Sequence, residues 1–376
     1  MLCRSLVVSF VVLVMMLTGP ARALAEGVAV DRPDAKAHDN AAKALAAAGP
    51  TMLEWPYSHY CVSGYRVVPS LEPGMGRIAR QGEIMTPKGY APIAALQNPI
   101  AAAPTEVFDN VYYVGNNFIG TLVFKTSAGL VLVDTMNNGT DVDRYLVPGL
   151  KTLHLDIKDV KWIILTHKHS DHYGGINRIL QLAPDAKVAV GKPDADALMA
   201  QRRAGLPPNA SEKQKQAYAL LPRRFDLEVS AYPGLQNGLR ELIVGGTHFT
   251  LALVPSHTPG MLSIIVPVTW KWAHHVVAIW GGDHVDNPDA VQKARQYASS
   301  LEFFHSLAEL AGVDAVIQPH IYQNDGFLRL EEMQSHPGMR NPFVIGADAY
   351  DRYVSIWTQC MQAFGRRMDE GTWNRF

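Results

Sequence analysis

The chain has 376 residues, and its 34 basic and 35 acidic side chains leave a formal net charge of −1. This near balance, with no basic run, argues against nucleic acid as a partner and leaves a small-molecule substrate as the expected one. The length suits one large domain or one domain with additions, and it leaves the oligomeric state open.

The first 25 residues have the layout of a secretory signal peptide. Arg4 precedes the apolar run Leu6–Leu17, Gly19-Pro20 ends that run, and Ala23–Ala25 offers a small-x-small cleavage site. The run is short for a membrane span, although an uncleaved anchor is the alternative. We therefore predict cleavage after Ala25, a periplasmic or secreted mature chain, and no stable membrane insertion once the signal is removed.

Residues 26–105 are predicted to form an N-terminal extension that is partly irregular, because they are rich in Ala and Pro and carry no readable motif. Cys61 lies in this extension and Cys360 lies near the C-terminus. In an oxidising compartment two such thiols can pair, but sequence alone does not show that their Cα atoms come close enough. A disulfide and two free thiols are therefore both left open.

Residues 106–376 are predicted to form one domain in which blocks of strands and helices alternate. Short β-branched and aromatic runs between turn residues indicate strands, and longer periodic runs indicate helices. The first half is expected to contain a β-meander of strands at 111–114, 119–125 and 130–133, a helix at 142–153, a strand at 162–165, a helix at 175–182 and a strand at 187–190.

The second half is predicted to repeat this order after a polar helical stretch at 192–226. It is expected to contain β-rich runs at 242–254, 262–268 and 275–280, a helix at 289–310, a strand at 313–317 and a tail helix at 347–364. Two similar halves of this kind predict an α+β fold in which two sheets pack together and helices lie outside.

The segment Thr166-His-Lys-His-Ser-Asp-His-Tyr-Gly-Gly175 directly follows a predicted strand and carries the strongest signal in the chain. His167 and His169 are two residues apart on extended backbone, so their side chains point the same way and can hold one ion. Asp171 and His172 follow at the turn into a helix and can face a neighbouring point. Imidazole and carboxylate ligands suit Zn²⁺, and the closing glycines let backbone pass close to the site.

Such a site needs further ligands from elsewhere in the chain, and strand ends are the expected places. His257 follows the predicted strand Phe249–Val254, and we predict it as a metal ligand. His320 follows the predicted strand Val313–Ile317 and is a second candidate. His336 competes with His320, although no strand precedes it.

Two aspartates each have two interpretations. Asp283, in Trp280-Gly-Gly-Asp-His284, is either a ligand that bridges two metals or a buried structural carboxylate. Asp134 ends a strand, where it either accepts a hydrogen bond from a metal-bound imidazole or caps the strand end. The region Trp270–Trp272 is likewise assigned either to the mouth of the cleft or to core packing.

These residues resemble the metallo-β-lactamase superfamily from roughly Val107 to the C-terminus, because T-H-x-H-x-D-H-x-G-G is the most specific motif of that superfamily. Within it, the chain is most similar to the third subclass of metallo-β-lactamases. Three further segments carry that likeness: Phe108–Gly115, His257–Gly260 and Asn341–Val344.

The resemblance implies a four-layer αββα sandwich with two Zn²⁺ ions. One zinc would take His167, His169 and His257; the second would take Asp171, His172 and His320, which favours His320 over His336. A zinc-bound hydroxide would attack a lactam or ester-type carbonyl, with Asp171 as the catalytic residue that orients it. Asp283 stays open, because some superfamily members use such an aspartate as a bridge and the third subclass does not.

One departure concerns His284-Val285-Asp286, which stands where the third subclass has small hydroxyl residues. An aspartate there would repel the carboxylate of an incoming lactam. The alternatives are therefore another superfamily hydrolase, namely a lactonase, thioesterase or sulfatase, and a non-catalytic zinc-binding protein. The complete ligand set argues against the last of these.

Overall fold

The structure is a computed structural model that describes residues 99–282 and 290–369, together with four short strands closer to the N-terminus. These strands pair antiparallel as two small sheets: β1 (Tyr65–Val68) with β2 (Arg77–Arg80), and β3 (Glu83–Thr86) with β4 (Gly89–Pro92). The predicted signal peptide, Cys61, the side chain of Cys360, and the segment that begins at Asp283 lie outside the described residues.

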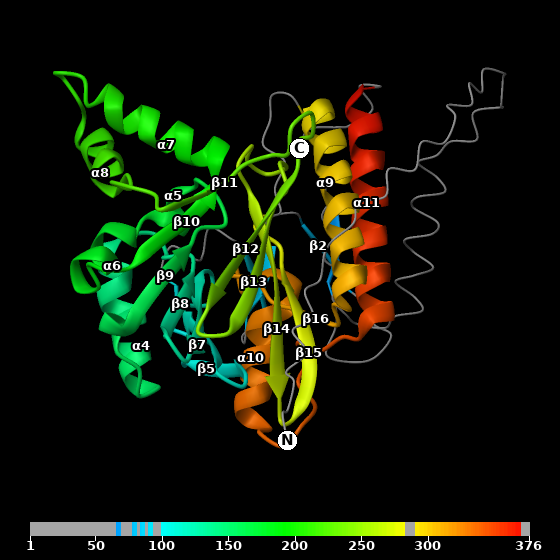
Figure 1. The fold of residues 1–376 in the computed structure, drawn as a ribbon. Helices are drawn as coiled ribbons and strands as arrows, with labels where there is room; N and C mark the ends of the chain where they lie inside the picture. The colour runs from blue at the N-terminus through cyan, green and yellow to red at the C-terminus, as the bar shows by residue number, and fades with distance from the viewer. Residues whose placement is uncertain are drawn as a thin grey trace, which may run out of the picture.

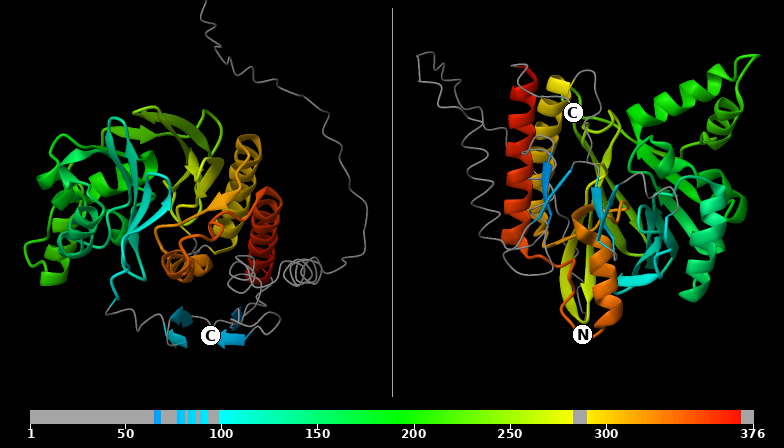
Figure 2. Two further views of the ribbon diagram at one scale, coloured as in Figure 1. Left: turned by 90° about the horizontal axis from the view of Figure 1, so that it is seen from below. Right: turned by 180° about the vertical axis from the view of Figure 1, so that it is seen from behind.

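Two large β-sheets face each other at the centre of the molecule (Figures 1 and 2). The first has seven strands in the order β11-β10-β9-β8-β7-β6-β5. The β5–β8 half is antiparallel, and β8 to β11 run parallel. Its strands are β5 (Thr105–Phe108), β6 (Val111–Gly115), β7 (Gly120–Thr126), β8 (Gly129–Val133), β9 (Val160–Ile164), β10 (Lys187–Gly191) and β11 (Leu227–Val229).

The second sheet has five strands in sequence order, antiparallel except for a parallel last pair. Its strands are β12 (Gly238–Val244), β13 (Thr247–Leu253), β14 (Leu262–Trp270), β15 (Ala273–Ile279) and β16 (Ala315–Val316). Antiparallel neighbours joined by short turns follow directly from the closely spaced β-branched runs in the sequence.

Helices cover the outer face of each sheet, which completes the four layers (Figure 2). The helices on the first sheet include α4 (Val147–Thr152), α6 (Ile176–Leu182) and α7 (Lys192–Ala204), and α8 (Glu212–Leu220) follows α7. The second sheet is covered by α9 (Ala290–Ala311) and α11 (Ala347–Asp369). The short elements are α3 (Gly139–Asp141), η3 (Val142–Leu146), η4 (Ile157–Asp159), α5 (Ser170–Tyr173), η5 (Gln323–Asp325) and α10 (Gly326–Ser335).

Alternating side chains along each strand explain how the layers are held. On β7, Leu122 and Phe124 pack between the sheets, whereas Val123 between them packs under the helices of the first layer. On β14, Ile264 points between the sheets and Ile265 points toward α9 and α11. Central strands such as β6 and β8 bury both faces and are therefore apolar nearly throughout. The α+β sandwich predicted from the sequence is confirmed.

Some details differ from the sequence prediction. The helix expected at 142–153 begins with a π-helical turn at Val142–Leu146, and the strand expected at 313–317 shrinks to Ala315–Val316. The short strand β11 and the helix α10 are additional. Phe327 on α10 contacts the core between the sheets, and Leu330 is part of that core.

The segment Trp270–Trp272 forms the turn of the β14–β15 hairpin. This turn is at the far end of β14 from Leu262, which donates its backbone N–H to Thr166 beside the histidine-rich segment. Trp272 is 96% exposed and Trp270 packs against the core between the sheets, so the core-packing interpretation fits Trp270 and neither residue lines the metal centre. Within the described residues, no helix is both long and apolar enough to span a membrane.

Candidate metal centre

The predicted ligands meet at one edge of the sandwich, where strands from both sheets end. Segment 166–172 follows β9 of the first sheet, whereas His257 follows β13 and His320 follows β16 of the second. A backbone hydrogen bond joins the two sheets at this edge, from Leu262 N–H to Thr166 O at 2.7 Å. The fold therefore gathers side chains that lie up to about 150 residues apart (His172 and His320 are 148 apart).

His167, His169 and His257 form the first of two ligand groups, with one ligand atom from each within 4.8 Å of the others. His167 Nε2 lies 3.1 Å from His169 Nδ1. Two ligands at about 2.1 Å from a tetrahedral zinc lie about 3.4 Å apart, so this spacing fits a shared ion. The ring of His257 stands edge-on to both other rings at 4.7 and 4.5 Å.

Asp171, His172 and His320 form the second group under the same 4.8 Å limit. His320 Nε2 lies 3.1 Å from His172 Nε2 and 3.3 Å from Asp171 Oδ2. The rings of His167 and His172 are 3.9 Å apart, which places the two groups side by side. One carboxylate and five imidazoles are the donor set that zinc prefers, so the residues fit a pair of zinc ions.

Asp134 and Thr166 fix the orientation of His172 from behind. His172 Nδ1 donates to Asp134 Oδ2 at 2.7 Å, so its Nε2 is the nitrogen that faces the ligand group. Thr166 donates its backbone N–H to Asp134 Oδ1 at 2.8 Å and its hydroxyl to Oδ2 at 2.8 Å. Asp134 is fully buried and has a left-handed φ of 63°, so the chain turns sharply to present this carboxylate. The geometry matches the interpretation of Asp134 as an acceptor for a ligand imidazole.

The carboxylate of Asp194 joins the two loops that carry the first group. Asp194 lies at the start of α7, is fully buried, and accepts the backbone N–H of Lys168 at 2.9 Å. It also accepts the Thr258 hydroxyl at 2.5 Å and the Gly260 N–H at 2.9 Å. Lys168 lies between the candidate ligands His167 and His169, and Thr258 follows His257. Asp194 is a positioning residue that the sequence analysis missed, although its place directly after strand β10 was a usable signal.

Phe118 and Tyr322 support His320. The Phe118 carbonyl accepts from His320 Nδ1 at 3.4 Å, so Nε2 is again the nitrogen that faces the ligand group. The Phe118 and Tyr322 rings stack at 5.2 Å with an interplanar angle of 3°. Both rings meet the His320 ring at steep angles, at 5.0 and 5.4 Å. The turn after β6 and the loop after β16 thus hold the His320 ring between them.

Glycines permit the close approach of backbone around the centre. A Cβ on Gly174 would lie 1.8 Å from Asn137 O, and one on Gly175 would lie 2.1 Å from Thr135 O. The expectation that these two glycines allow close packing is confirmed. A Cβ on Gly282 would lie 2.6 Å from Cδ2 of His257, so this glycine leaves room for a ligand ring.

Two pKa shifts describe the electrostatics of the centre. Burial, followed by the charges of the other imidazoles, lowers the pKa of His167 well below its ordinary value. Burial acts to raise the pKa of Asp171, but the charges of His172 and His320 and a hydrogen bond from His320 outweigh it and hold that pKa far below its usual range. A neutral imidazole and an ionised carboxylate are the forms that bind metals.

The remaining predicted residues lie elsewhere. His336 is exposed near the end of α10, away from both groups, and lines a small surface pocket with Trp270 and Glu106. Asp283, the predicted bridging candidate, lies outside the described residues, so its two interpretations stay open.

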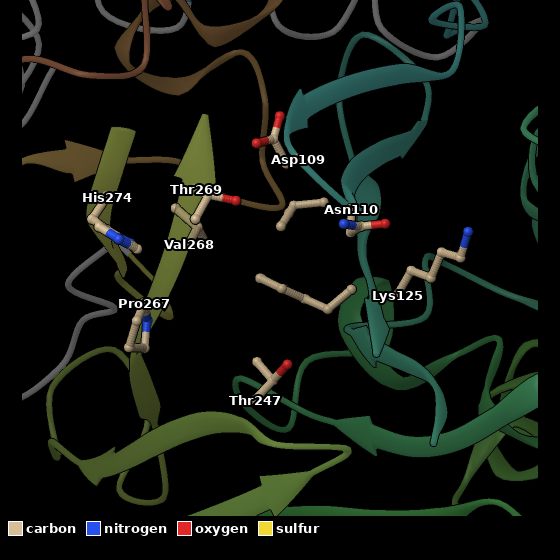
Figure 3. Close-up of a pocket in the computed structure, with 10 residues that line it drawn as sticks. Asp109, Asn110, Lys125, Thr247, Pro267, Val268, Thr269 and His274 are labelled. Carbon is tan, nitrogen blue, oxygen red and sulfur yellow. The ribbon is translucent and has the colours of Figure 1, made fainter. Parts of the chain in front are cut away.

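A separate pocket of about 260 Å³ lies between the sheets, bordered by the turns after β5 and β12 (Figure 3). Asp109, Lys125 and His274 are among its lining residues. The other labelled side chains are Pro267, Val268 and Thr269 from the far part of β14, Asn110 from the turn after β5, and Thr247 at the start of β13. None of the described groups of metal ligands lines it. It is therefore distinct from the candidate metal centre.

Comparison with known proteins finds a family model that matches part of the chain. Residues 117–269 match the model of the metallo-beta-lactamase superfamily. A curated relative, alkyl/aryl-sulfatase BDS1 of Saccharomyces cerevisiae, is 33% identical over 79 residues, which are 21% of this chain and 12% of the sulfatase. The match therefore spans only a small part of that relative.

Solved structures match over a much larger part of the chain. Similar folds include BJP-1, a subclass B3 metallo-beta-lactamase of Bradyrhizobium japonicum (TM-score 0.58, 23% identity, 74% of this chain and 98% of that chain). Native FEZ-1 metallo-beta-lactamase of Legionella gormanii gives a TM-score of 0.55 at 20% identity, covering 73% of this chain and 99% of that chain. The class B3 di-zinc metallo-beta-lactamase LRA-12 from an Alaskan soil metagenome gives a TM-score of 0.53 at 17% identity, covering 73% of this chain and 96% of that chain. These findings confirm the resemblance of the chain to the metallo-β-lactamase superfamily and, in fold, to its subclass B3 enzymes.

Proposed function

We propose that this chain is an exported, zinc-dependent hydrolase that cleaves a lactam or an ester-type bond in a small-molecule substrate. The observation that carries the proposal is the pair of adjacent three-ligand groups at the edge where the two sheets meet. Fold and family match support a metal-dependent hydrolase in general.

The proposed ligands are His167, His169 and His257 for one zinc, and Asp171, His172 and His320 for the other. Bound zinc would supply Lewis acidity, which lowers the pKa of water and polarises the bond to be cleaved. Two observations support this ligand set: the pKa of His167 is lowered, and His172 and His320 each donate their Nδ1–H away from the site.

Asp171 is the proposed catalytic residue. Its carboxylate is ionised, is 29% exposed, and lies next to His320 and His172, so solvent and substrate can reach it. Such a carboxylate can orient an attacking water through a hydrogen bond and pass its proton to the leaving group.

A second candidate function is hydrolysis of a sulfate ester, because the yeast relative is an alkyl/aryl-sulfatase. The same centre would serve, since both reactions need an activated water and stabilisation of a developing anion. A lactam substrate carries a carboxylate, and Asp286 of this chain would repel that negative charge. Turnover of aryl sulfate without turnover of lactam would favour this second candidate.

The first test is zinc content and turnover of the purified mature chain. We expect two zinc ions per chain and chelator-sensitive hydrolysis of either a chromogenic cephalosporin or a member of a lactone, thioester and aryl sulfate panel. Asp171→Asn should lower kcat by about 10²–10⁴-fold, the range for loss of a general base. His336→Ala, which changes an exposed histidine outside both groups, is the matched control and should leave kcat unchanged.

The outcomes separate the alternatives. Two bound zinc ions with no turnover on the whole panel would favour a non-catalytic zinc-binding protein. Absence of bound zinc in a folded chain would reject the proposal altogether.

Export is part of this proposal and has its own test. Expression with the full N-terminus in a Gram-negative host should yield a periplasmic or secreted chain whose first residue is Glu26. Intact-mass analysis reads the cleavage site directly, and an uncleaved, membrane-bound product would support the anchor alternative.

A further inference from the structure

A third cluster of potential metal ligands lies on the outer helical layer. His305 and Glu309 are four residues apart on α9, so they share one face of the helix, and Asp351 reaches the same point from α11. One ligand atom from each residue lies within 4.8 Å of the other two, and His305 Nε2 is 3.0 Å from Asp351 Oδ1. Among the described residues only three groups meet this criterion, and the other two form the metal centre.

The charge of this cluster favours a cation. Two carboxylates stand next to one imidazole, and within the described part of the chain no basic side chain other than His305 is in ion-pair contact with either of them. Like charges held close together raise the free energy of the site unless a cation joins them. An ion at this point would bring the carboxylates together with His305 and neutralise them.

The helix pair holds the three residues on a firm support. The helices α9 and α11 run side by side along the second sheet (Figures 1 and 2) and share a buried cluster that includes Tyr297 and Trp357, whose rings lie 5.7 Å apart. About one helical turn before His305, Glu302 on α9 accepts a hydrogen bond from Gln362 on α11 at 3.1 Å. A ligand set on two packed helices needs little reordering on binding.

We propose that His305, Glu309 and Asp351 form a further zinc site that ties α9 to α11. One nitrogen and two oxygen donors fit Zn²⁺, whereas Mg²⁺ and Ca²⁺ prefer oxygen ligands alone. Asp351 and His305 are partly exposed, at 46% and 23%, so water can complete the coordination and the ion can exchange with solvent. Helix α11 also contacts β16, the strand that precedes His320. Zinc at this site would therefore stabilise the helix pair that packs behind the second ligand group.

The test is a zinc titration of the full mature chain after its tight sites are filled. We expect one additional equivalent of Zn²⁺ by isothermal titration calorimetry and a rise in Tm of about 5 °C at roughly 100 times its Kd. Glu309→Gln and Asp351→Asn keep side-chain size and remove one charge each. Each should lower the affinity for the additional zinc ion by about 10–100-fold and leave the content of tightly bound zinc unchanged.

Glu302→Gln is the matched control, because it changes a carboxylate of the same helix that contacts α11 but lies outside the cluster. It should keep the additional equivalent and the Tm rise. The proposal is overturned if the wild-type chain takes up no additional zinc, or if Glu309→Gln and Asp351→Asn both bind it as tightly as Glu302→Gln. Since the readout is uptake beyond the tight sites, failure here does not affect the proposed hydrolase.

Discussion

Replacing Asp194 tests whether the first ligand group depends on a carboxylate that touches none of its ligand atoms. Asp194 accepts three hydrogen bonds from two loops, from Lys168, Thr258 and Gly260. Asp194→Ala removes all three acceptor contacts and leaves buried donors unpaired. Asp194→Asn can keep an oxygen toward Lys168 and Thr258 but turns an N–H₂ toward the Gly260 N–H.

The size of the effect follows from these contacts. A hydrogen bond to a charged group contributes about 1.5–3 kcal/mol, so the gross loss in Asp194→Ala is about 5–9 kcal/mol. Burial raises the pKa of Asp194 and opposes its charge, so part of this loss is recovered when the carboxylate is removed. We expect a net loss of about 3–5 kcal/mol in the free energy of unfolding for Asp194→Ala, and about 2–4 kcal/mol for Asp194→Asn.

The assay combines urea denaturation of the metal-free chain with zinc retention against a competing chelator. Both variants should lose about 10–100-fold in affinity for one of the two zinc ions, because the loops that present the first group are no longer tied together. The control is Asp196→Asn, which lies two residues further along α7, with a side chain 61% exposed. Wild-type zinc affinity in Asp194→Ala would refute the assignment of Asp194 as a positioning residue.

Three further predictions concern other contacts. Asp134→Asn should weaken binding of the second zinc by about 10–100-fold, as measured by chelator competition. The amide can turn a donating NH₂ group toward His172 Nδ1, so it no longer fixes the tautomer of that ring. Gly282→Ala should lower zinc content and turnover, since its Cβ would lie 2.6 Å from the His257 ring. Burial, then the charge of nearby Glu106, raises the pKa of Tyr112 to about 12. Because the phenol ionises in the unfolded chain before it does in the folded chain, the free energy of unfolding should keep its full value below pH 10 and decline as the pH rises toward 12. Urea midpoints measure this decline.

Each of these has a control and a contradicting outcome. Gly338→Ala adds a Cβ where nothing lies within 4 Å, and it should bind zinc normally. Unchanged zinc content in Gly282→Ala would show that the His257 ring is free to move. Asp143→Asn changes an exposed carboxylate and is the control for Asp134→Asn. Normal zinc affinity in Asp134→Asn would reject the role given to the Asp134 carboxylate. Glu106→Gln should lower the pKa of Tyr112, and a phenol that titrates near 10 in the folded wild-type chain would contradict the shift.

The sequence predicted the part of the site that is local in the chain. Segment 166–175 places four candidate ligands and two close-packing glycines in one short run, so its geometry follows from strand and helix periods alone. His257 and His320 could be proposed because each follows a predicted strand. The choice of His320 over His336 needed the resemblance, and the structure agrees, because only His320 reaches Asp171 and His172.

What the sequence could not supply are contacts between distant loops. The partners of Asp194 lie 26, 64 and 66 residues away, and the Phe118 carbonyl lies 202 residues from His320. Such pairs depend on how the two sheets pack, which local periodicity does not encode. Helix α10 is different, because Phe327, Leu330 and Met333 have helical spacing and pack against the core between the sheets, so this signal was present in the sequence.

Each proposed zinc draws ligands from both sheets. Segment 166–172 belongs to the first sheet, whereas His257 and His320 belong to the second. The ions would then act as cross-links between the two halves of the sandwich as well as reagents within it. Chelation should accordingly lower the cooperativity with which the two halves unfold. By the same linkage, a mutation that loosens the packing between the sheets should lower the metal affinity even where it lies far from the ligands.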